Sequence, residues 1–412
     1  MNTQVQIDDV VDSPRAWRRL AAGFVISTVG SAGMWVPQTV LPLLQAEFGV
    51  GRAGASLPYT ATMIGVAVGT IAMGRLADRF GIFPLLVFAA IALGSGYVFA
   101  GTAESLMQFA LIQGAIIATL GVAVTFAPLV ADVSLWFKCR LGLAVAIAAS
   151  GNYLAGAIWP PFAQRMAEEF GWRGAYYGVA ALSVAIILPL AFLFRTRLHA
   201  QTAAQAAASG ALGEAARPLG FAPNTLQALL MLAGLACCIA MSMPQVHIVA
   251  YCSDLGYGAA SGAKMLSLML GLGLVSRLAS GWIADRIGGL RTLMLGSAGQ
   301  MLALLLFLPF DGLSSLYAIS ALFGFVQGGV VACYAIIVRE HFPAREAATR
   351  VGVAITATIL GMAAGGWLSG LIFDFTGSYS WAFAHGIAWN AVNVVIVGWL
   401  ILRERAPHLR RG

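Results

Sequence analysis

One arginine of the sequence falls inside a long apolar run, and its chemistry is the most specific clue in the chain. Arg277 follows about nineteen residues of the same run, of which only Lys264 is charged, and it stands four residues before Gly281. An unpaired guanidinium at such depth in lipid costs at least about 2.5 kcal/mol, so we expect Arg277 to face a water-filled cavity or a partner. The guanidinium is planar, and its paired N–H donors match the two oxygens of a carboxylate. Alternatively, Arg277 snorkels to the cytoplasm or pairs with Asp132 or Asp285.

The positions of the acidic residues limit which side chains within the apolar runs could carry a proton. All 17 carboxylates fall in tails, loops or the ends of apolar runs, and Asp132 is the nearest to a membrane interior. His247, beside Gln245, titrates near neutral pH and could take up a proton with a substrate. A neutral histidine hydrogen-bonded between helices is the equal alternative. We expect His385 to be structural.

Other polar side chains within the apolar runs are candidates to line a central cavity. They are Gln38, Asn152, Tyr153 and Tyr334. Each is alternatively a hydrogen-bonding group between neighbouring helices.

The composition requires elements that lie in lipid. Hydrophobic residues make up 59% of the 412 residues, charged residues only 10%, and the mean hydropathy is +0.84. The apolar runs are about 20 to 27 residues long, enough for α-helices to cross about 30 Å of hydrocarbon. The alternation typical of a β-barrel is absent. The predicted spans are 18–44, 56–76, 82–103, 105–132, 140–166, 173–195, 224–251, 258–282, 289–309, 313–339, 347–373 and 379–402.

The basic residues predict the orientation. With a cytoplasmic N-terminus, nineteen of the 24 lysines and arginines fall on the inner side and four on the outer side, namely Arg52, Arg165, Arg173 and Lys264. This bias predicts that both termini are cytoplasmic, in the plasma membrane of a bacterium-like cell, the bacterial inner membrane. It also accounts for the net charge of +7 without a nucleic acid as partner. The first twenty residues lack the pattern of a removed signal peptide.

The sequence offers no cofactor site. Its five cysteines lack metal-ligand spacing, and no glycine cluster has the pattern of a phosphate-binding loop. We expect no metal, no cofactor and no enzymatic nucleophile.

An internal repeat divides the chain. GRLADRFG at 74–81 recurs as GWIADRIG at 281–288, an offset of 207, and Phe137 corresponds to Phe342 at an offset of 205. The repeat predicts a first bundle over 1–195, a cytoplasmic linker over 196–222 and a second bundle over 223–412. A substrate site is expected between such repeats, near the membrane midplane.

The repeated motif resembles the signature of the major facilitator superfamily, Gly-x-Leu-Ala-Asp-Arg-x-Gly between helices 2 and 3. Ile82 and Phe83 stand where a basic pair usually follows. The resemblance covers essentially the whole chain and implies twelve transmembrane helices in two pseudo-symmetric six-helix bundles, an all-α membrane fold. It also implies a gating role for the motif, with an ordinary loop cap as the alternative for Asp78. The expected gating residues are Gly74, Asp78, Arg79, Gly81, Gly281, Asp285 and Arg286.

Three stretches are similar to the monocarboxylate transporters and the related oxalate/formate antiporters, namely 136–156, 242–256 and 274–288. Arg277 matches the position where these families place a substrate arginine, and helices 1 and 10 line the cavity in the superfamily, which favours Gln38 and Tyr334. This chain departs from the animal members, because it has no lysine in helix 1 and has Gly273 in place of an aspartate. It also lacks the antiporters' second cation, in helix 11, and one cation suits a monoanion.

The sequence therefore predicts a secondary active carrier of a small organic anion, a monocarboxylate, working by alternating access. The expected substrate-binding residues are Arg277, Tyr334, Gln38, Asn152 and His247. Protons or a second anion would drive it. One alternative is a proton-driven exporter of drug-like or other small molecules, which the lack of central carboxylates disfavours. Another is a non-transporting receptor or scaffold. The sequence does not specify the oligomeric state.

Overall fold

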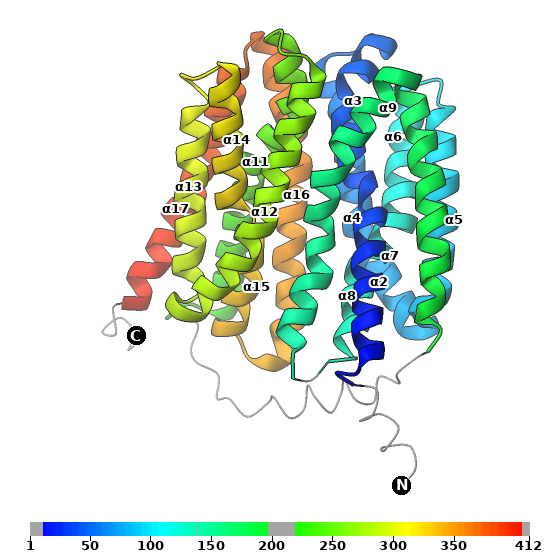
Figure 1. Ribbon diagram of the computed structural model, residues 1–412. Coiled ribbons are helices and arrows are strands. Elements are labelled where there is room, and N and C mark those ends of the chain that lie inside the picture. Colours follow the sequence, from blue (N-terminus) through cyan, green and yellow to red (C-terminus); the bar gives the residue numbers. More distant parts are fainter. Residues whose placement is uncertain (1–10, 138, 197–218, 406–412) are drawn as a thin grey trace. The chain divides into compact units, whose positions relative to one another are not determined.

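The computed structural model describes residues 11–137, 139–196 and 219–405, and these residues form helices joined by short connections, without a strand (Figure 1). Contacts divide the chain into two units. Unit 1 comprises Met1–Phe48 and Leu57–Ala208, and unit 2 comprises Gly49–Ser56 and Ser209–Gly412. Most of the predicted linker over 196–222 lies outside the described residues.

Unit 1 holds the helices of the N-terminal half. They are α2 (Pro14–Gly30), α3 (Ala32–Phe48), α4 (Arg52–Phe80), α5 (Ile82–Gly101), α6 (Leu106–Leu111), the π-helix η1 (Ile112–Val122), α7 (Ala123–Thr125), α8 (Ala127–Ser134), α9 (Leu141–Ala191) and the 3₁₀ turn η2 (Phe192–Phe194). Helices α2 and α3 follow each other with a break at Ser31, and helices α6 to α8 together make another crossing. The first turn of α4 is the exception, because it belongs to unit 2.

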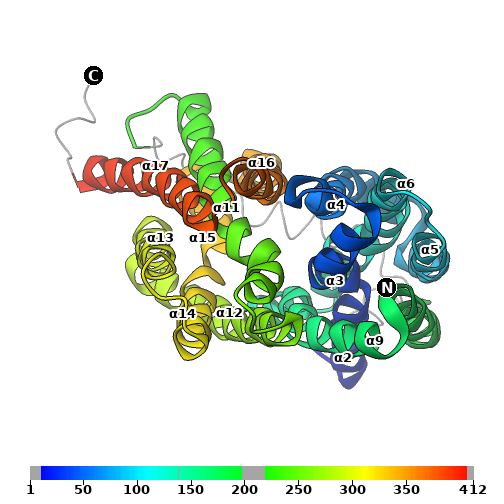
Figure 2. The same ribbon diagram turned by 90° about the horizontal axis from the view of Figure 1, so that it is seen from above.

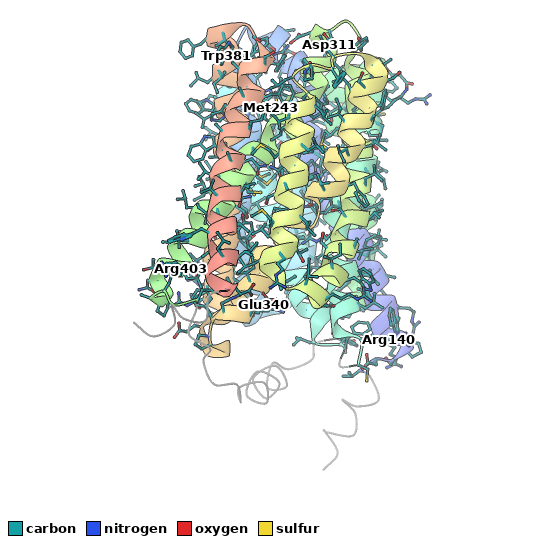
Figure 3. The ribbon with its side chains drawn as sticks, turned by 90° about the vertical axis from the view of Figure 1, so that its left-hand side faces the viewer. Arg140, Met243, Asp311, Glu340, Trp381 and Arg403 are labelled. Carbon is teal, nitrogen blue, oxygen red and sulfur yellow. The ribbon has the colours of Figure 1, made fainter. Side chains whose placement is uncertain are left out.

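Unit 2 holds the helices of the C-terminal half. They are α11 (Pro223–Asp254), α12 (Ala259–Ile287), α13 (Gly289–Leu306), α14 (Leu313–Gln327), α15 (Val330–His341), α16 (Ala344–Thr376) and α17 (Tyr379–Arg405). Viewed from above, many of these helices are seen nearly end-on (Figure 2). Glu340 and Arg403 lie toward one end of this unit and Asp311 and Trp381 toward the other (Figure 3).

Helix α9 contains two predicted spans. The described residues hold eleven helices long and apolar enough to cross a membrane, and one of them, Leu143–Phe194, has 52 residues. At about 1.5 Å per residue it is more than twice as long as a bilayer core is thick. Gly171 has φ 73° and ψ 168°, which interrupts the helix between the spans predicted at 140–166 and 173–195. Counting this helix as two crossings gives the predicted twelve.

The last glycine of each repeated motif has the same unusual backbone conformation. Gly81 has φ 84° and ψ 166° between α4 and α5, and Gly288 has φ 85° and ψ 160° between α12 and α13. A side chain is strongly disfavoured in this region of φ and ψ. The matching conformations support the internal repeat and explain why both motifs end in glycine.

Small residues bring helix backbones together within each unit. A Cβ added to Gly65 of α4 would lie 2.3 Å from the carbonyl oxygen of Gly114 in η1. In unit 2, a Cβ on Gly365 of α16 would lie 2.4 Å from the carbonyl oxygen of Ile239 in α11. Such close approach is typical of helix pairs in membranes.

Candidate functional site

Arg277 lies on the packed side of α12. Successive residues of an α-helix are about 100° apart, so Arg277 shares a side with Gly273, one turn earlier, which is buried. The side chains of Val275, Leu278 and Trp282 are 50%, 49% and 61% exposed and mark the opposite, lipid-facing side. Arg277 itself is half-buried. The guanidinium is thus carried by the side of the helix that faces protein rather than the side that faces lipid.

The depth of Arg277 in the helix agrees with a position inside a membrane span. It stands eight residues before Asp285, the first charged residue toward the C-terminal end of α12. This spacing corresponds to about 12 Å along the helix axis. Asp132, considered as its partner, instead pairs with Arg19 in unit 1 through a contact of 2.8 Å.

Tyr334 of α15 belongs to a buried polar network in unit 2. Its hydroxyl donates to Oδ1 of Asn393 at 3.0 Å, and the amide of Asn393 donates to the hydroxyl of Ser297 at 2.7 Å. All three side chains are fully buried. These bonds join α15, α17 and α13, which favours the interhelical alternative for Tyr334 in this conformation.

His247 of α11 is also fully buried. Its Nε2 lies 2.8 Å from the carbonyl oxygen of Gly366 in α16, which is a hydrogen bond when Nε2 carries the proton, and its Nδ1 has no hydrogen-bond partner among the described residues. The neighbouring Gln245 donates to Gln327 of α14 at 2.7 Å. The imidazole therefore contributes to the packing of α11 against α16.

The two candidates of unit 1 differ in how their polar atoms are satisfied. Asn152 of α9 accepts from the indole nitrogen of Trp35 at 3.1 Å. Gln38 of α3 is fully buried, and neither its amide oxygen nor its amide nitrogen has a partner among the described residues. An unsatisfied buried polar group costs about 1–3 kcal/mol. Gln38 is therefore the less completely bonded of the two.

The expected gating residues lie at helix ends. Asp78, Arg79, Asp285 and Arg286 are exposed, and Arg286 stacks over the ring of Trp282 at 3.3 Å. Glu340, which the sequence did not single out, caps a helix end next to the second motif. Glu340 of α15 accepts from the backbone N–H of Gly289 at 3.0 and 3.1 Å, at the start of α13.

The first glycine of each motif faces open space. A Cβ added to Gly74 or to Gly281 would meet no atom of the described residues within 4 Å. Gly81 and Gly288 are required by their backbone conformation, whereas these two glycines are not required by any contact in this structure.

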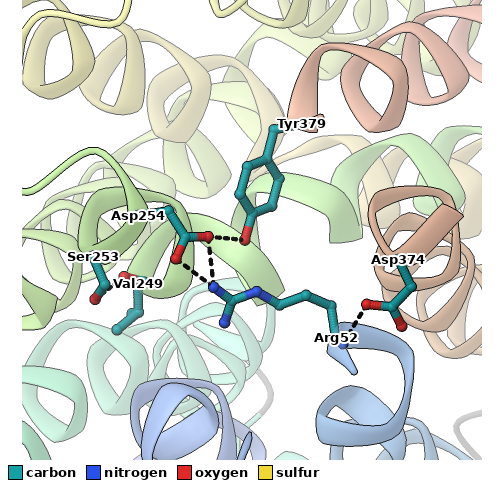
Figure 4. Close-up of polar contacts among 6 residues, drawn as sticks. All are labelled: Arg52, Val249, Ser253, Asp254, Asp374 and Tyr379. Atoms are coloured by element: carbon teal, nitrogen blue, oxygen red, sulfur yellow. Dashed lines mark hydrogen bonds and ion pairs between the residues drawn. The ribbon is translucent and has the colours of Figure 1, made fainter. Parts of the chain in front are cut away.

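A second buried arginine, Arg52, forms a cluster that the sequence reading missed (Figure 4). Arg52 starts α4, yet it belongs to unit 2 and is only 5% exposed. Its Nη2 donates to both carboxylate oxygens of Asp254, at 2.6 and 2.5 Å, and the hydroxyl of Tyr379 donates to the same carboxylate at 3.2 Å. Its Nε and Nη1 have no hydrogen-bond partner among the described residues.

A second carboxylate holds the backbone of the same segment. Asp374 of α16 accepts from the backbone N–H of Arg52 at 2.6 Å and of Ala53 at 2.9 Å, so it caps the N-terminus of α4. Gly370 allows this approach, because a Cβ there would lie 2.8 Å from the backbone nitrogen of Ala53. We call Arg52, Asp254, Asp374 and Tyr379 the Arg52 cluster.

The signal for the Arg52 cluster in the sequence was weak. Arg52 was one of only four basic residues assigned to the outer side, and Asp254 and Asp374 stand at the ends of apolar runs. Each is typical of an exposed loop charge. Only the fold brings together residues that are 202 and 322 positions apart.

Comparison with known proteins identifies the kind of chain. The profile described as the Major Facilitator Superfamily matches residues 23–357. A protein described as monocarboxylate transporter 13 from Bos taurus is 29% identical over 325 residues, covering 78% of this chain and 74% of the relative. Its counterpart from Rattus norvegicus is 28% identical over 328 residues, covering 78% and 74%.

Two further comparisons extend this result. An MFS-type transporter from Gibberella moniliformis is 26% identical over 312 residues, covering 75% of this chain and 72% of the relative. Among solved structures, the nucleoside transporter NupG matches with a TM-score of 0.70 at 12% identity, covering 93% of this chain and 99% of that chain. At this identity the likeness concerns the fold alone.

Proposed function

Because the chain belongs to the major facilitator superfamily, we propose that it is a secondary active transporter of small organic anions, foremost monocarboxylates, that works by alternating access. The family and the transporter relatives indicate transport rather than catalysis. The observation that carries the choice of an anion is the position of Arg277 on the packed side of α12.

Arg277 is the proposed anion-binding group. A guanidinium offers two parallel N–H donors to one carboxylate, and such a charge-assisted pair is stronger than a neutral hydrogen bond. The half-buried position on the packed side of α12 keeps the guanidinium off the lipid-facing side of the helix. The names of the monocarboxylate transporters among the relatives agree with this substrate class.

We assign secondary roles to the remaining candidates. The amide of Gln38 has no hydrogen-bond partner among the described residues and would hydrogen-bond the substrate. Asn152, which lies beside Trp35, would also contact the substrate. Tyr334 would act through its packing, because its hydroxyl is engaged with Asn393. The lack of a second intramembrane cation near Arg277 in the sequence supports a monoanion over a dicarboxylate.

We propose that transport is coupled either to protons or to exchange with a second anion. In the proton route, His247 takes up a proton when α11 and α16 separate and the bond to Gly366 is lost. In the exchange route, a second anion returns on the same site. Uptake that keeps its pH dependence in His247→Gln would exclude the His247 route.

We propose that the Arg52 cluster and the two repeated motifs control access to the substrate site. Helix α4 begins in unit 2 and continues in unit 1 at Leu57, so we propose that the segment Gly49–Ser56 is released from Asp254 and Asp374 during the transport cycle. We propose that Gly74 and Gly281, which have room for a Cβ here, make close contacts in another state of the cycle.

Uptake into proteoliposomes tests the proposal. The purified chain would be offered labelled acetate, lactate and pyruvate, a dicarboxylate, and a lipophilic cation. Accumulation of the monocarboxylates is the expected result. Movement of the cation alone would favour the exporter alternative, and movement of none of the compounds would contradict both proposed substrate classes.

A further inference from the structure

A cavity lined by three arginines lies at the start of α2 in unit 1. Its volume is about 220 Å³, and its walls are formed by Arg15, Arg18, Arg19, Trp136, Leu193 and Thr196. One water needs only roughly 10–15 Å³ of such space. The cavity is therefore large enough for a polar group the size of a phosphate, and among the described residues that line it none is acidic.

The charge of the cavity comes from two of these arginines. Arg19 is neutralised, because Asp132 accepts from its Nε at 2.9 Å and from its Nη2 at 3.0 Å. Arg15 and Arg18 are exposed and add two guanidinium groups. Asp12 lies nearby in the chain, but its carboxylate accepts from the backbone N–H of Cys139 and does not line the cavity. An anion would be attracted to this wall.

Arg19 is the buried arginine of the cavity wall, and contacts on several sides hold its guanidinium in place. The Arg19 guanidinium lies between two rings, 4.4 Å from the centroid of Trp136 and 4.3 Å from that of Phe194. Its Nη1 donates to the carbonyl oxygen of Leu193 at 3.0 Å. These contacts join α2, η2 and the segment after α8, and they hold the Arg19 side of the cavity in place.

A second, larger cavity of unit 1 adjoins the first. Its volume is about 650 Å³, and it shares Arg19 and Thr196 with the arginine-lined cavity. The remaining wall includes three phenylalanines, Phe80, Phe83 and Phe194, and it also carries the charged residues Asp78, Asp132 and Arg195. A basic hollow that continues into one with a phenylalanine-lined part suits the two parts of an amphiphile, a phosphate headgroup and an acyl chain.

We propose that these two cavities bind an anionic phospholipid, with its phosphate against Arg15 and Arg18 and part of an acyl chain beside Phe80, Phe83 and Phe194. The arginines lie on the side that the charge distribution predicts to be cytoplasmic, where basic pockets between helices bind acidic lipid headgroups. The shared chemistry is a phosphate group, and the three phenylalanines of the adjoining cavity favour a lipid over free phosphate.

Thermal unfolding of the delipidated full chain in detergent tests this site. We would add phosphatidylglycerol, phosphatidylcholine with the same acyl chains, or inorganic phosphate. Phosphatidylglycerol should raise the unfolding temperature by about 3 °C more than phosphatidylcholine does, as binding to the folded state alone requires. Arg15→Gln/Arg18→Gln should lose this difference. The control Arg291→Gln/Arg339→Gln, with the same change of charge on exposed residues of unit 2, should keep it.

Three results would overturn the proposal. Equal stabilisation by the two lipids would exclude recognition of the acidic headgroup. Loss of the difference in both double variants would show attraction to surface charge in general. The full effect with inorganic phosphate would show an anion site without a place for the acyl chain.

Discussion

Each unit contains a buried arginine, and the two guanidinium groups differ in how their charge and their N–H donors are compensated. Arg19 is 3% exposed and Arg52 is 5% exposed, and each forms an ion pair with an aspartate. Arg19 uses Nε, Nη1 and Nη2 as donors and lies between two aromatic rings. The side chain of Arg52 hydrogen-bonds through Nη2 alone and lies 5.5 Å from the ring centroid of Phe373, and its Nε and Nη1 have no hydrogen-bond partner among the described residues.

This difference indicates that the Arg19–Asp132 ion pair is permanent and that the Arg52–Asp254 ion pair can open. A buried ion pair stabilises only when its remaining donors are also satisfied. Arg19 meets this condition, and the side chain of its partner Asp132 is only 15% exposed. Arg52 does not meet it, and the side chain of Asp254 is 39% exposed, so water can replace the arginine. We therefore interpret the Arg19 pair as part of the scaffold and the Arg52 cluster as a latch.

Breaking the scaffold pair should have the largest effect. Asp132→Asn leaves the Arg19 guanidinium buried without its counter-charge, which should lower the free energy of unfolding by about 3–5 kcal/mol. Denaturant unfolding in detergent measures this. Glu169→Gln is the control, because it removes an exposed pair with Arg165 and should cost less than about 0.5 kcal/mol. Equal effects of the two substitutions would remove the distinction between scaffold and surface pairs.

Breaking the latch should have a smaller and more local effect. Asp254→Asn should lower the free energy of unfolding by about 1–3 kcal/mol, because water reaches the released groups. Amide hydrogen exchange of residues 49–56 should become faster, while exchange in α2 stays unchanged. If exchange in 49–56 did not change, Asp254 would not hold this segment.

Close packing of the segment against α16 provides a third comparison. Gly370→Ala places a Cβ 2.8 Å from the backbone of Ala53 and should destabilise by about 1 kcal/mol. Gly352→Ala lies on the same helix with open space around it and should stabilise by about 0.5–1 kcal/mol through helix propensity. The same sign of effect in both variants would contradict the packing at Gly370.

The smallest effect concerns the phenol of the latch. Tyr379→Phe removes one hydrogen bond to Asp254 and should cost about 0.5 kcal/mol. In a double-mutant cycle with Asp254→Ala, which removes the acceptor, the two losses should not add, because both substitutions remove the same bond. Additive losses would place Tyr379 outside the cluster.

The fold could be predicted from local patterns, but the two buried arginines could not. Apolar run lengths and the motif repeated at Gly81 and Gly288 predicted the twelve crossings, because span length and glycine conformation are properties of short segments. Arg19 and Arg52 were counted as ordinary loop charges. Their burial depends on aspartates 113 and 202 positions away, and only tertiary packing brings those together.

The candidate site was likewise predictable in part. An arginine inside an apolar run is visible in the sequence, and the structure places Arg277 on the packed side of α12. The bond of the Tyr334 hydroxyl to Asn393 and the unsatisfied amide of Gln38 were not visible, because a hydrogen-bond partner on another helix leaves no local pattern.

The most direct measurement of the central claim is monocarboxylate uptake by Arg277→Gln in proteoliposomes, beside Arg277→Lys and Arg291→Gln. If Arg277 binds the carboxylate, Arg277→Gln should lower kcat/KM roughly 10- to 100-fold, which corresponds to losing a hydrogen bond to a charged group. Arg277→Lys should retain part of the uptake, and Arg291→Gln should be unaffected. Undiminished uptake of the monocarboxylate by folded Arg277→Gln would contradict the assignment of Arg277 as the anion site.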